Sequence, residues 1–299
     1  MPTNLLTLRD HIEYATERFS EANLYFGHGT DNAWDEAVAL VLHALHLPHY
    51  INPSVLDARI TQEQKQRIME LIELRVEKRL PVPYLTHEAW FSGMSFYVDE
   101  RVLIPRSPIA ELIENRFAPW INPDNVQHIL DLCTGSACIG IVCAKYFPAA
   151  TVDVSDISAD ALEVAKMNVV QHKVENQVHL HKSDLFESLP KTKYDVIVSN
   201  PPYVSQQEMD ELPNEYNHEP TLALVAGATG LDFARRILSH ASDYLAPHGI
   251  LIVEVGNSEI ALAEAYPQVP FTWLEFERGG GGVFLLTKDQ LDECGRVFY

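Results

Sequence analysis

The sequence predicts an α/β fold, in which a largely parallel sheet follows a small helical domain. Three observations carry this prediction. Apolar residues recur at helical spacing over the first 85 residues, at a spacing of two over residues 86–104, and in alternating strand-like and helix-like segments from about residue 125. Because strand–helix alternation builds parallel sheets with helices on both faces, we expect a helical domain over residues 1–85, a linking β-hairpin over 86–104 and an α/β domain over 105–299.

Three helices are expected in the N-terminal domain. The first spans residues 7–23, and the second is capped by Asp31 or Asn32. The third begins with Thr61 and Gln64, whose spacing fits a capping box. The second helix carries an apolar stripe, which consists of Trp34, Val38, Val41, Leu42 and Leu45.

The linker over residues 86–104 alternates apolar and polar side chains around Gly93, which is typical of a β-hairpin. It contains Trp90. We expect Trp90, like Trp34 of the second helix, to pack in the core or between the domains rather than to contact a substrate.

The α/β domain is expected to contain seven strands. Five of them follow the alternation and lie at 126–132, 151–156, 178–182, 194–199 and 250–255, with helices at 137–146, 158–172, 231–245 and 258–266. The last two, 271–277 and 283–287, flank the glycines of residues 279–282. Strands joined by a short turn pair in the antiparallel sense, so these two should extend one edge of the sheet.

The composition restricts the partners that the chain can bind. Its 22 Lys and Arg residues stand against 42 Asp and Glu residues, giving a formal net charge of −20. Duplex-DNA binding depends on cations that pair with phosphates, so extended DNA binding is not expected. An acidic body attracts a basic protein, although the same excess could serve solubility alone.

Neither membrane insertion nor metal binding is expected from the sequence. No apolar run reaches the roughly 20 residues that a membrane helix needs. The four cysteines form no Cys-x-x-Cys pair. A reduced, cytoplasmic protein without a metal site is therefore the prediction.

Acidic residues stand at the ends of the first three predicted strands, where ligands bind in such sheets. Gly135 opens a tight turn whose amides lie at a helix N-terminus, which suits a carboxylate. Asp156 can accept hydrogen bonds from two ribose hydroxyls, and Asp184 can accept one from an adenine amino group. We expect a nucleoside with an amino-acid tail, held by Asp131, Cys133, Thr134, Gly135, Asp156, Asp184, Leu185 and Asn200.

Two alternatives exist for these residues. A dinucleotide oxidoreductase would carry Gly-x-Gly-x-x-Gly for a pyrophosphate, whereas here Gly135 is followed by Gly140 inside the predicted helix. A strand-end aspartate can also serve only as a helix cap. Three aspartates at successive strand ends favour the ligand site.

The fourth strand delivers Asn200-Pro201-Pro202-Tyr203 to the same edge of the sheet. Two prolines fix φ and remove two donors, which leaves the carbonyls of Asn200 and Pro201 as fixed acceptors. With the Asn200 side-chain oxygen they can bind both hydrogens of a planar NH₂ group, while Tyr203 offers a flat face. We expect all four residues to bind the acceptor substrate, and Asn200, Pro201 and Tyr203 to be catalytic. A Pro-Pro turn that merely ends a strand is the alternative.

Hydrogen-bond acceptors at these positions would activate an amide nitrogen as a nucleophile. An amide nitrogen delocalises its lone pair into the carbonyl and is a poor nucleophile. Acceptors on its hydrogens favour the pyramidal transition state, and alignment with the bond to be broken supplies further acceleration.

The segment Asn200-Pro201-Pro202-Tyr203 and the acids at the strand ends resemble the amino-methyltransferase branch of class I S-adenosylmethionine methyltransferases. Residues 103–108, followed by Glu111, are similar to the stretch before the catalytic domain of protein-glutamine methyltransferases, and His218-Glu219-Pro220 resembles the loop after their catalytic motif. The resemblance implies a Rossmann-like class I fold, S-adenosyl-L-methionine as methyl donor and S-adenosyl-L-homocysteine as product. Arg106 and Glu111 should then flank the site and orient a lid and the cofactor's amino-acid end, or else form a surface ion pair.

Within that family, residues 26–37 and 133–136 are similar to the branch that methylates a glutamine of large-subunit ribosomal protein uL3. The resemblance implies uL3, free or in the assembling large subunit, as the partner, selected by the helical domain. A release-factor glutamine methyltransferase, a nucleic-acid adenine methyltransferase and an inactive assembly factor stay open as alternatives. Ala137 departs from the family, in which glycine is usual, and should narrow the space beside the cofactor's tail.

Overall fold

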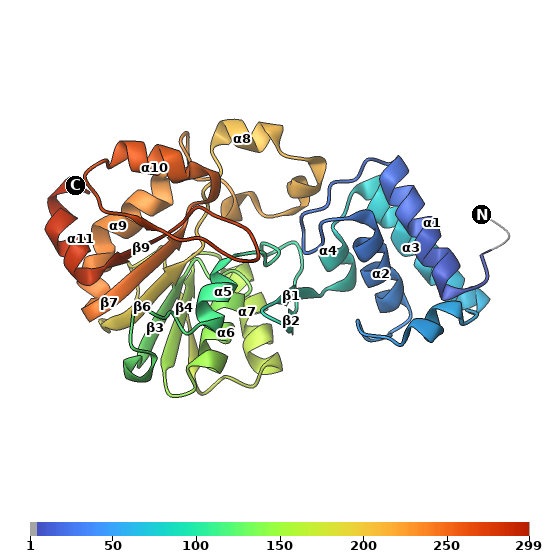
Figure 1. The fold of residues 1–299 in the computed structure, drawn as a ribbon, viewed down its shortest axis with the longest axis horizontal. Coiled ribbons are helices and arrows are strands. Elements are labelled where there is room, and N and C mark those ends of the chain that lie inside the picture. The colour runs from blue at the N-terminus through green and yellow to red at the C-terminus, as the bar shows by residue number, and fades with distance from the viewer. Residues whose placement is uncertain (1–4, 299) are drawn as a thin grey trace. The chain divides into compact units, whose positions relative to one another are not determined.

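A computed structural model describes residues 5–298 of the chain (Figure 1). The chain divides into two compact units. The helical unit comprises the chain up to Ala89 together with Val98–Glu100 and Pro213–His218. The sheet-containing unit comprises Trp90–Tyr97, Arg101–Leu212 and the chain from Glu219 onward. In the described residues, no helix is both long enough and apolar enough to cross a membrane.

The helical unit confirms the three predicted helices and their starts. Asn32 caps the second helix by accepting a hydrogen bond from the Asp35 N–H, and Thr61 and Gln64 form both hydrogen bonds of a capping box. A short fourth helix was not predicted. The elements are α1 (Leu8–Glu21), α2 (Ala33–Ala44), the 3₁₀ helix η1 (Pro53–Asp57), α3 (Gln62–Lys78) and α4 (Val82–Thr86).

The core of the helical unit differs from the predicted stripe at one position. Ile12, Phe19, Leu40 and Ile72 are fully buried together. Trp34 was expected in that core, but 40% of its surface is exposed. It lies in the first turn of α2, where the buried face runs instead through smaller side chains.

A buried charge cluster joins two parts of the helical unit that are far apart in sequence. The Arg75 Nε lies 2.5 Å from Glu36 Oε1, and both side chains are almost fully buried. Glu215 Oε1 lies 3.5 Å from Arg75 Nη1 and 2.9 Å from Arg79 Nη1, and it accepts the Tyr25 N–H at 3.0 Å. The segment Pro213–His218 is thereby fixed within this unit.

The other unit is built on the predicted seven-stranded sheet. Its order is β5-β4-β3-β6-β7-β9-β8, with β9 antiparallel to both of its neighbours and the other pairs parallel. The antiparallel edge pair is therefore confirmed. The strands are β3 (His128–Leu132), β4 (Thr151–Asp156), β5 (Val178–Lys182), β6 (Tyr194–Ser199), β7 (Leu245–Glu254), β8 (Thr272–Trp273) and β9 (Val283–Thr287).

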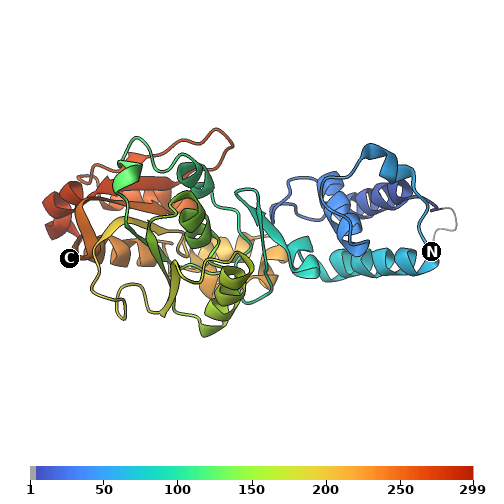
Figure 2. The same ribbon diagram turned by 90° about the horizontal axis from the view of Figure 1, so that it is seen from below.

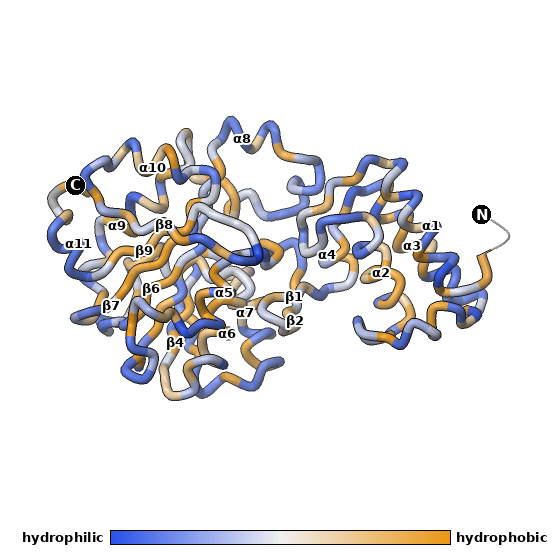
Figure 3. The backbone as a smooth tube through the Cα atoms, viewed as in Figure 1, coloured by the Kyte–Doolittle hydropathy of each residue, from blue (hydrophilic) through white to orange (hydrophobic). Residues whose placement is uncertain are grey.

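Helices cover both faces of this sheet, as the views in Figures 1 and 2 show. One apolar core packs α5, α6 and α7 on one face, and a second packs α9, α10 and α11 on the other. Hydrophobic residues dominate the central strands, whereas α8 is mostly hydrophilic (Figure 3). The helices are α5 (Ile109–Glu114), α6 (Cys138–Tyr146), α7 (Ala159–Gln171), α8 (Gln206–Glu211), α9 (Asp232–Tyr244), α10 (Glu259–Ala265) and α11 (Lys288–Cys294).

The predicted hairpin is present but shorter than residues 86–104. It consists of β1 (Ala89–Phe91) and β2 (Met94–Phe96), joined by Ser92 and Gly93, which have φ of +49° and +71°. Two successive residues at positive φ form the turn that suits the twist of a two-residue hairpin. Trp90 is 44% exposed, so it does not pack in the core, which was one of the two places expected for it.

Candidate active site

The carboxyl ends of four neighbouring strands meet at one level of the sheet. In the register, Leu132 of β3 is the partner of Ser155 in β4 and of Ser199 in β6. The next residues, Asp156 and Asn200, therefore follow at the same edge, on either side of the central strand. Strand order reverses between β3 and β6, and such a switch point is where ligands bind in open α/β sheets.

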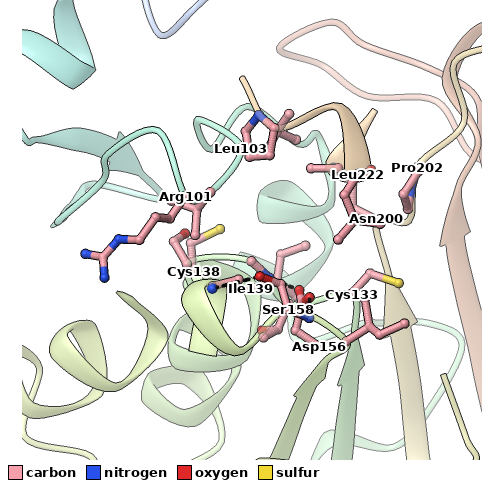
Figure 4. A pocket seen from close by; sticks show the side chains of 18 of the residues that line it. Arg101, Leu103, Cys133, Cys138, Ile139, Asp156, Ser158, Asn200, Pro202 and Leu222 are labelled. Carbon is pink, nitrogen blue, oxygen red and sulfur yellow. Dashed lines mark hydrogen bonds between the residues drawn. The ribbon is translucent and has the colours of Figure 1, made fainter. Parts of the chain in front are cut away.

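A cavity occupies this edge (Figure 4). Its empty volume, including the part open to solvent, is about 960 Å³. The cavity is lined by residues from the turn after β3, the ends of β4, β5 and β6, and the segments 101–107 and 220–223. Of the residues predicted to bind the cofactor, it includes Cys133, Thr134, Gly135, Asp156, Asp184, Leu185 and Asn200.

Asp131 lies behind the turn after β3 and is not among the residues that line the cavity. Its Oδ2 accepts hydrogen bonds from Thr134 Oγ1 at 2.5 Å and from the Gly140 N–H at 3.0 Å. Burial raises the pKa of this carboxyl to about 7, against the lowering effect of both donors. Asp131, which was expected to bind the cofactor, thus holds the turn after β3 from within the protein.

Two small residues allow the turn to pack against the sheet. Gly140 faces the Val154 side chain so closely that a Cβ would overlap it. Ala137 has φ of +63°, is fully buried in the apolar core and does not line the cavity. The expectation that its methyl group narrows the cofactor's space was therefore wrong, because the left-handed backbone turns that methyl group into the core.

Asp156 presents its carboxylate to the cavity while bonded to two backbone amides. Oδ2 accepts the Gly135 N–H at 2.9 Å, and Oδ1 accepts the Ser158 N–H at 2.9 Å. Burial raises the pKa of Asp156, and these N–H groups oppose that shift. The carboxylate is thus fixed in orientation and poorly solvated, which favours a ligand with hydroxyl donors.

Asp184 lies at the wall of the cavity and is paired with a cation that sequence reasoning missed. Arg236 Nη1 of α9 lies 2.9 Å from Asp184 Oδ1. Apolar surface adjoins it, since Leu185 and the 45%-exposed Ile157 also line the cavity. An acid beside apolar surface suits a heteroaromatic ring that carries an amino group.

Asn200 and Pro202 line the cavity, whereas Pro201 is buried and Tyr203 stands outside the lining residues. The Asn200 side-chain amide makes no hydrogen bond to any residue between 5 and 298. In the same range, the carbonyl oxygens of Asn200 and Pro201 accept no backbone hydrogen bond. The side chain of Asn200 points into the space above the turn in Figure 4.

Tyr203 is held closely by the segments that follow β7 and precede α9. Its carbonyl accepts a hydrogen bond from Ser258 Oγ at 3.0 Å and lies against Gly230. Its ring lies over Gly256, where a Cβ would come within 2.5 Å of Cε2. The ring of Tyr203, which was predicted to offer a flat face to the substrate, is therefore held in place by these contacts.

Arg106 lines the cavity, but its partner is not Glu111. Arg106 forms a two-pronged pair with Glu219, at 2.6 Å and 2.7 Å, and Glu219 also accepts the Ile104 N–H at 3.0 Å. Glu111 lies away from the cavity and accepts the Glu277 N–H at 2.9 Å. The carboxylate of Glu111 holds the chain that leads into residues 279–282, so the ion pair between Arg106 and Glu111 that was given as the alternative is absent.

Comparisons with known proteins show what this chain is similar to. A model of the methyltransferase small domain matches residues 115–215. Among solved structures, the hMettl16 catalytic domain, solved with MAT2A 3′UTR hairpin 6, has a TM-score of 0.50 at 19% identity, covering 80% of this chain and 86% of that one. At that identity the likeness shows the shared fold alone.

Three proteins named ribosomal protein uL3 glutamine methyltransferase align with almost the whole chain. The protein from Francisella tularensis is 52% identical over 96% of this chain and 92% of its own length. Those from Bordetella pertussis and Neisseria gonorrhoeae are 49% and 50% identical, covering 96% of this chain and 97% and 96% of their own. With such identity over nearly the whole of both chains and a methyltransferase domain over residues 115–215, this chain belongs to the family of ribosomal protein uL3 glutamine methyltransferases.

Proposed function

We propose that this protein transfers a methyl group from S-adenosyl-L-methionine to the side-chain amide nitrogen of a glutamine in ribosomal protein uL3. The names of three relatives at about half identity support the substrate. One observation in the structure carries the chemistry. Asn200 lines the cavity, and its side chain and the carbonyls of Asn200 and of the adjoining, buried Pro201 have no hydrogen-bond partner among the described residues.

The cavity fits the cofactor through its donor set. Asp156 would accept hydrogen bonds from the ribose hydroxyls, and Asp184 would accept one from the adenine amino group beside Leu185. The amides of the turn at Gly135 would face the carboxylate of the amino-acid tail. When bound, the cofactor supplies a methyl group on a positively charged sulfur, ready for direct displacement.

The protein's contribution is to hold and polarise the acceptor. Asn200 Oδ1 and the Pro201 carbonyl would accept the two hydrogens of the glutamine amide and orient its nitrogen toward the methyl group. The hydrogen bonds to both acceptors strengthen as positive charge develops on that nitrogen, so these acceptors stabilise the transition state more than the ground state.

The substrate range follows from charge and from the relatives. The net charge of −20 favours a basic protein such as a ribosomal protein over a phosphate backbone. We propose that the helical N-terminal domain over residues 1–85, with the hairpin linker, selects uL3, and that the α/β domain from residue 105 carries the chemistry. A ribosomal substrate implies that the protein acts in the cytoplasm.

A side-by-side methylation assay tests this function. Purified uL3, the two peptide release factors, duplex DNA and ribosomal RNA would each be incubated with the protein and labelled S-adenosyl-L-methionine. We expect label in uL3 alone. Label in a release factor, but not in uL3, would show that the substrate is assigned wrongly, and label in nucleic acid would contradict amide methylation altogether.

A further inference from the structure

Glu254 is a buried carboxylate beside the acceptor segment, and the function proposed above gives it no role. It is the last residue of β7 and is 5% exposed. In the register, Val253 is the partner of Ser199 in β6. Glu254 and Asn200 are therefore the next residues on two adjacent strands, at the same edge of the sheet.

The side chains of Glu254 and Asn200 also belong to the same face. Alternate residues of a strand point to the same side of a sheet. Val198 in β6 and Ile252 in β7 both lie in the apolar core that packs α5 and α6. Two positions further along each strand, Asn200 and Glu254 continue that face beyond the end of the core.

Both carboxylate oxygens of Glu254 accept hydrogen bonds from hydroxyl groups at the site. Oε1 accepts from Tyr203 Oη at 3.2 Å. Oε2 accepts from Ser107 Oγ at 2.5 Å, and Ser107 lines the cofactor cavity. The carboxylate thus links Tyr203, of the segment 200–203, to Ser107, which lies in the segment 101–107 at the cavity.

The remaining contacts of Tyr203 make this hydrogen bond consequential. Its carbonyl accepts a hydrogen bond from Ser258 Oγ, and the Cδ2–Cε2–Cζ edge of its ring lies against Gly256. These contacts restrain the residue at its backbone and its ring plane, while Glu254 restrains the hydroxyl end. Loss of the Glu254 hydrogen bond would remove the restraint at the hydroxyl end of the ring.

We infer that Glu254 is a positioning residue, whose ionised carboxylate holds the Tyr203 ring and the Ser107 segment in the orientation that a glutamine amide requires. The inference rests on the proposed function, because it deepens the role of the same acceptor site. Glu254 acts through Tyr203 and does not itself touch the substrate. Protonation of Glu254 turns one of its two acceptor oxygens into a donor, so one of the two restraints weakens.

The surroundings of Glu254 place this protonation near neutral pH. Burial raises its pKa to about 7, against the lowering effects of the Ser107 and Tyr203 hydroxyls and of the Arg106 charge. Arg106 is the cation that faces it, and Arg106 is itself paired with Glu219. Turnover should therefore rise with pH between roughly 6 and 8, as the carboxylate ionises.

The test is a set of pH profiles for kcat and for KM of S-adenosyl-L-methionine, with uL3 as substrate. Glu254→Gln preserves the side-chain shape and removes the ionisation. We expect kcat to fall about tenfold or more, as for a misplaced reacting group, and the rise of kcat through pH 7 to disappear. KM for the cofactor should change less than threefold. Glu264→Gln, an exposed position on α10, is the matched control and should follow the wild type.

Tyr203→Phe provides the second arm. It removes one hydroxyl, so it should lose the same pH-dependent rise, and the double variant should be no slower than the slower single variant. If Glu254→Gln does not fold in a thermal unfolding scan, the Tyr203→Phe profile alone decides. A retained rise in that variant, or a wild-type kcat in Glu254→Gln, overturns the inference. Absence of uL3 methylation by the wild-type protein would instead overturn the proposed function.

Discussion

Asp156 offers a direct test of the cofactor site, because its carboxylate is fixed before any ligand binds. Replacing Asp156 with alanine removes the proposed acceptor of both ribose hydroxyls and releases the Gly135 and Ser158 amides that it holds at 2.9 Å each. A hydrogen bond to a charged acceptor contributes about 1.5 kcal/mol or more. Two of them give about 3 kcal/mol, so S-adenosyl-L-homocysteine should bind about 100-fold more weakly.

Isothermal titration calorimetry with S-adenosyl-L-homocysteine measures this loss without turnover. Asp160→Ala is the control, because Asp160 is an exposed acid in the first turn of α7. Its affinity should equal that of the wild type. An Asp156→Ala affinity within threefold of the wild type would refute the proposed ribose contact.

The pH dependence of the same titration gives a second measure of Asp156. Burial raises its pKa in the free protein, so folding favours the protonated acid, and the stability that this provides is lost as pH rises through that folded pKa. Hydroxyl donors of a bound nucleoside favour the ionised form and lower the pKa. Affinity should therefore increase as pH rises through the pKa of the free protein. Asp156→Asn should remove that increase.

Two further substitutions test the structural argument. Gly140→Ala places a methyl group against the Val154 side chain and should lower the free energy of unfolding by about 1–3 kcal/mol in a urea titration; unchanged stability would show that the turn has room there. Glu215→Ala leaves Arg75 without one of its buried partners and should cost about 3–5 kcal/mol. A loss below 1 kcal/mol in the same titration would show that the charge cluster is not needed to hold the segment 213–218.

The strands of the sheet and its antiparallel edge pair could be predicted, because each strand carries its own local signal, whereas the order of the strands was not predicted. β4, β5 and β6 lie at the predicted residues, since short apolar runs are bounded there by polar turns. The helices that were missed are short. α8 and α11 each begin with a capping box, a signal that was present in the sequence but was not used.

The pairings within the site could not be predicted in the same way, because they join residues far apart in the chain. Arg106 was expected near Glu111, five residues away, but it pairs with Glu219. Nothing in the local spacing shows that pairing, nor that of Arg236 with Asp184. Asn200 was found because its chemistry is concentrated in four consecutive residues.

The account as a whole depends on the acceptor role of Asn200. Fragmentation mass spectrometry of uL3, after reaction with the wild-type protein or with Asn200→Ala, tests it most directly. We predict one added methyl group on a glutamine side-chain amide, formed about 100-fold or more slowly by Asn200→Ala, with S-adenosyl-L-homocysteine bound almost as tightly as before. A methyl group on any other atom, or turnover by Asn200→Ala within tenfold of the wild type, would contradict it.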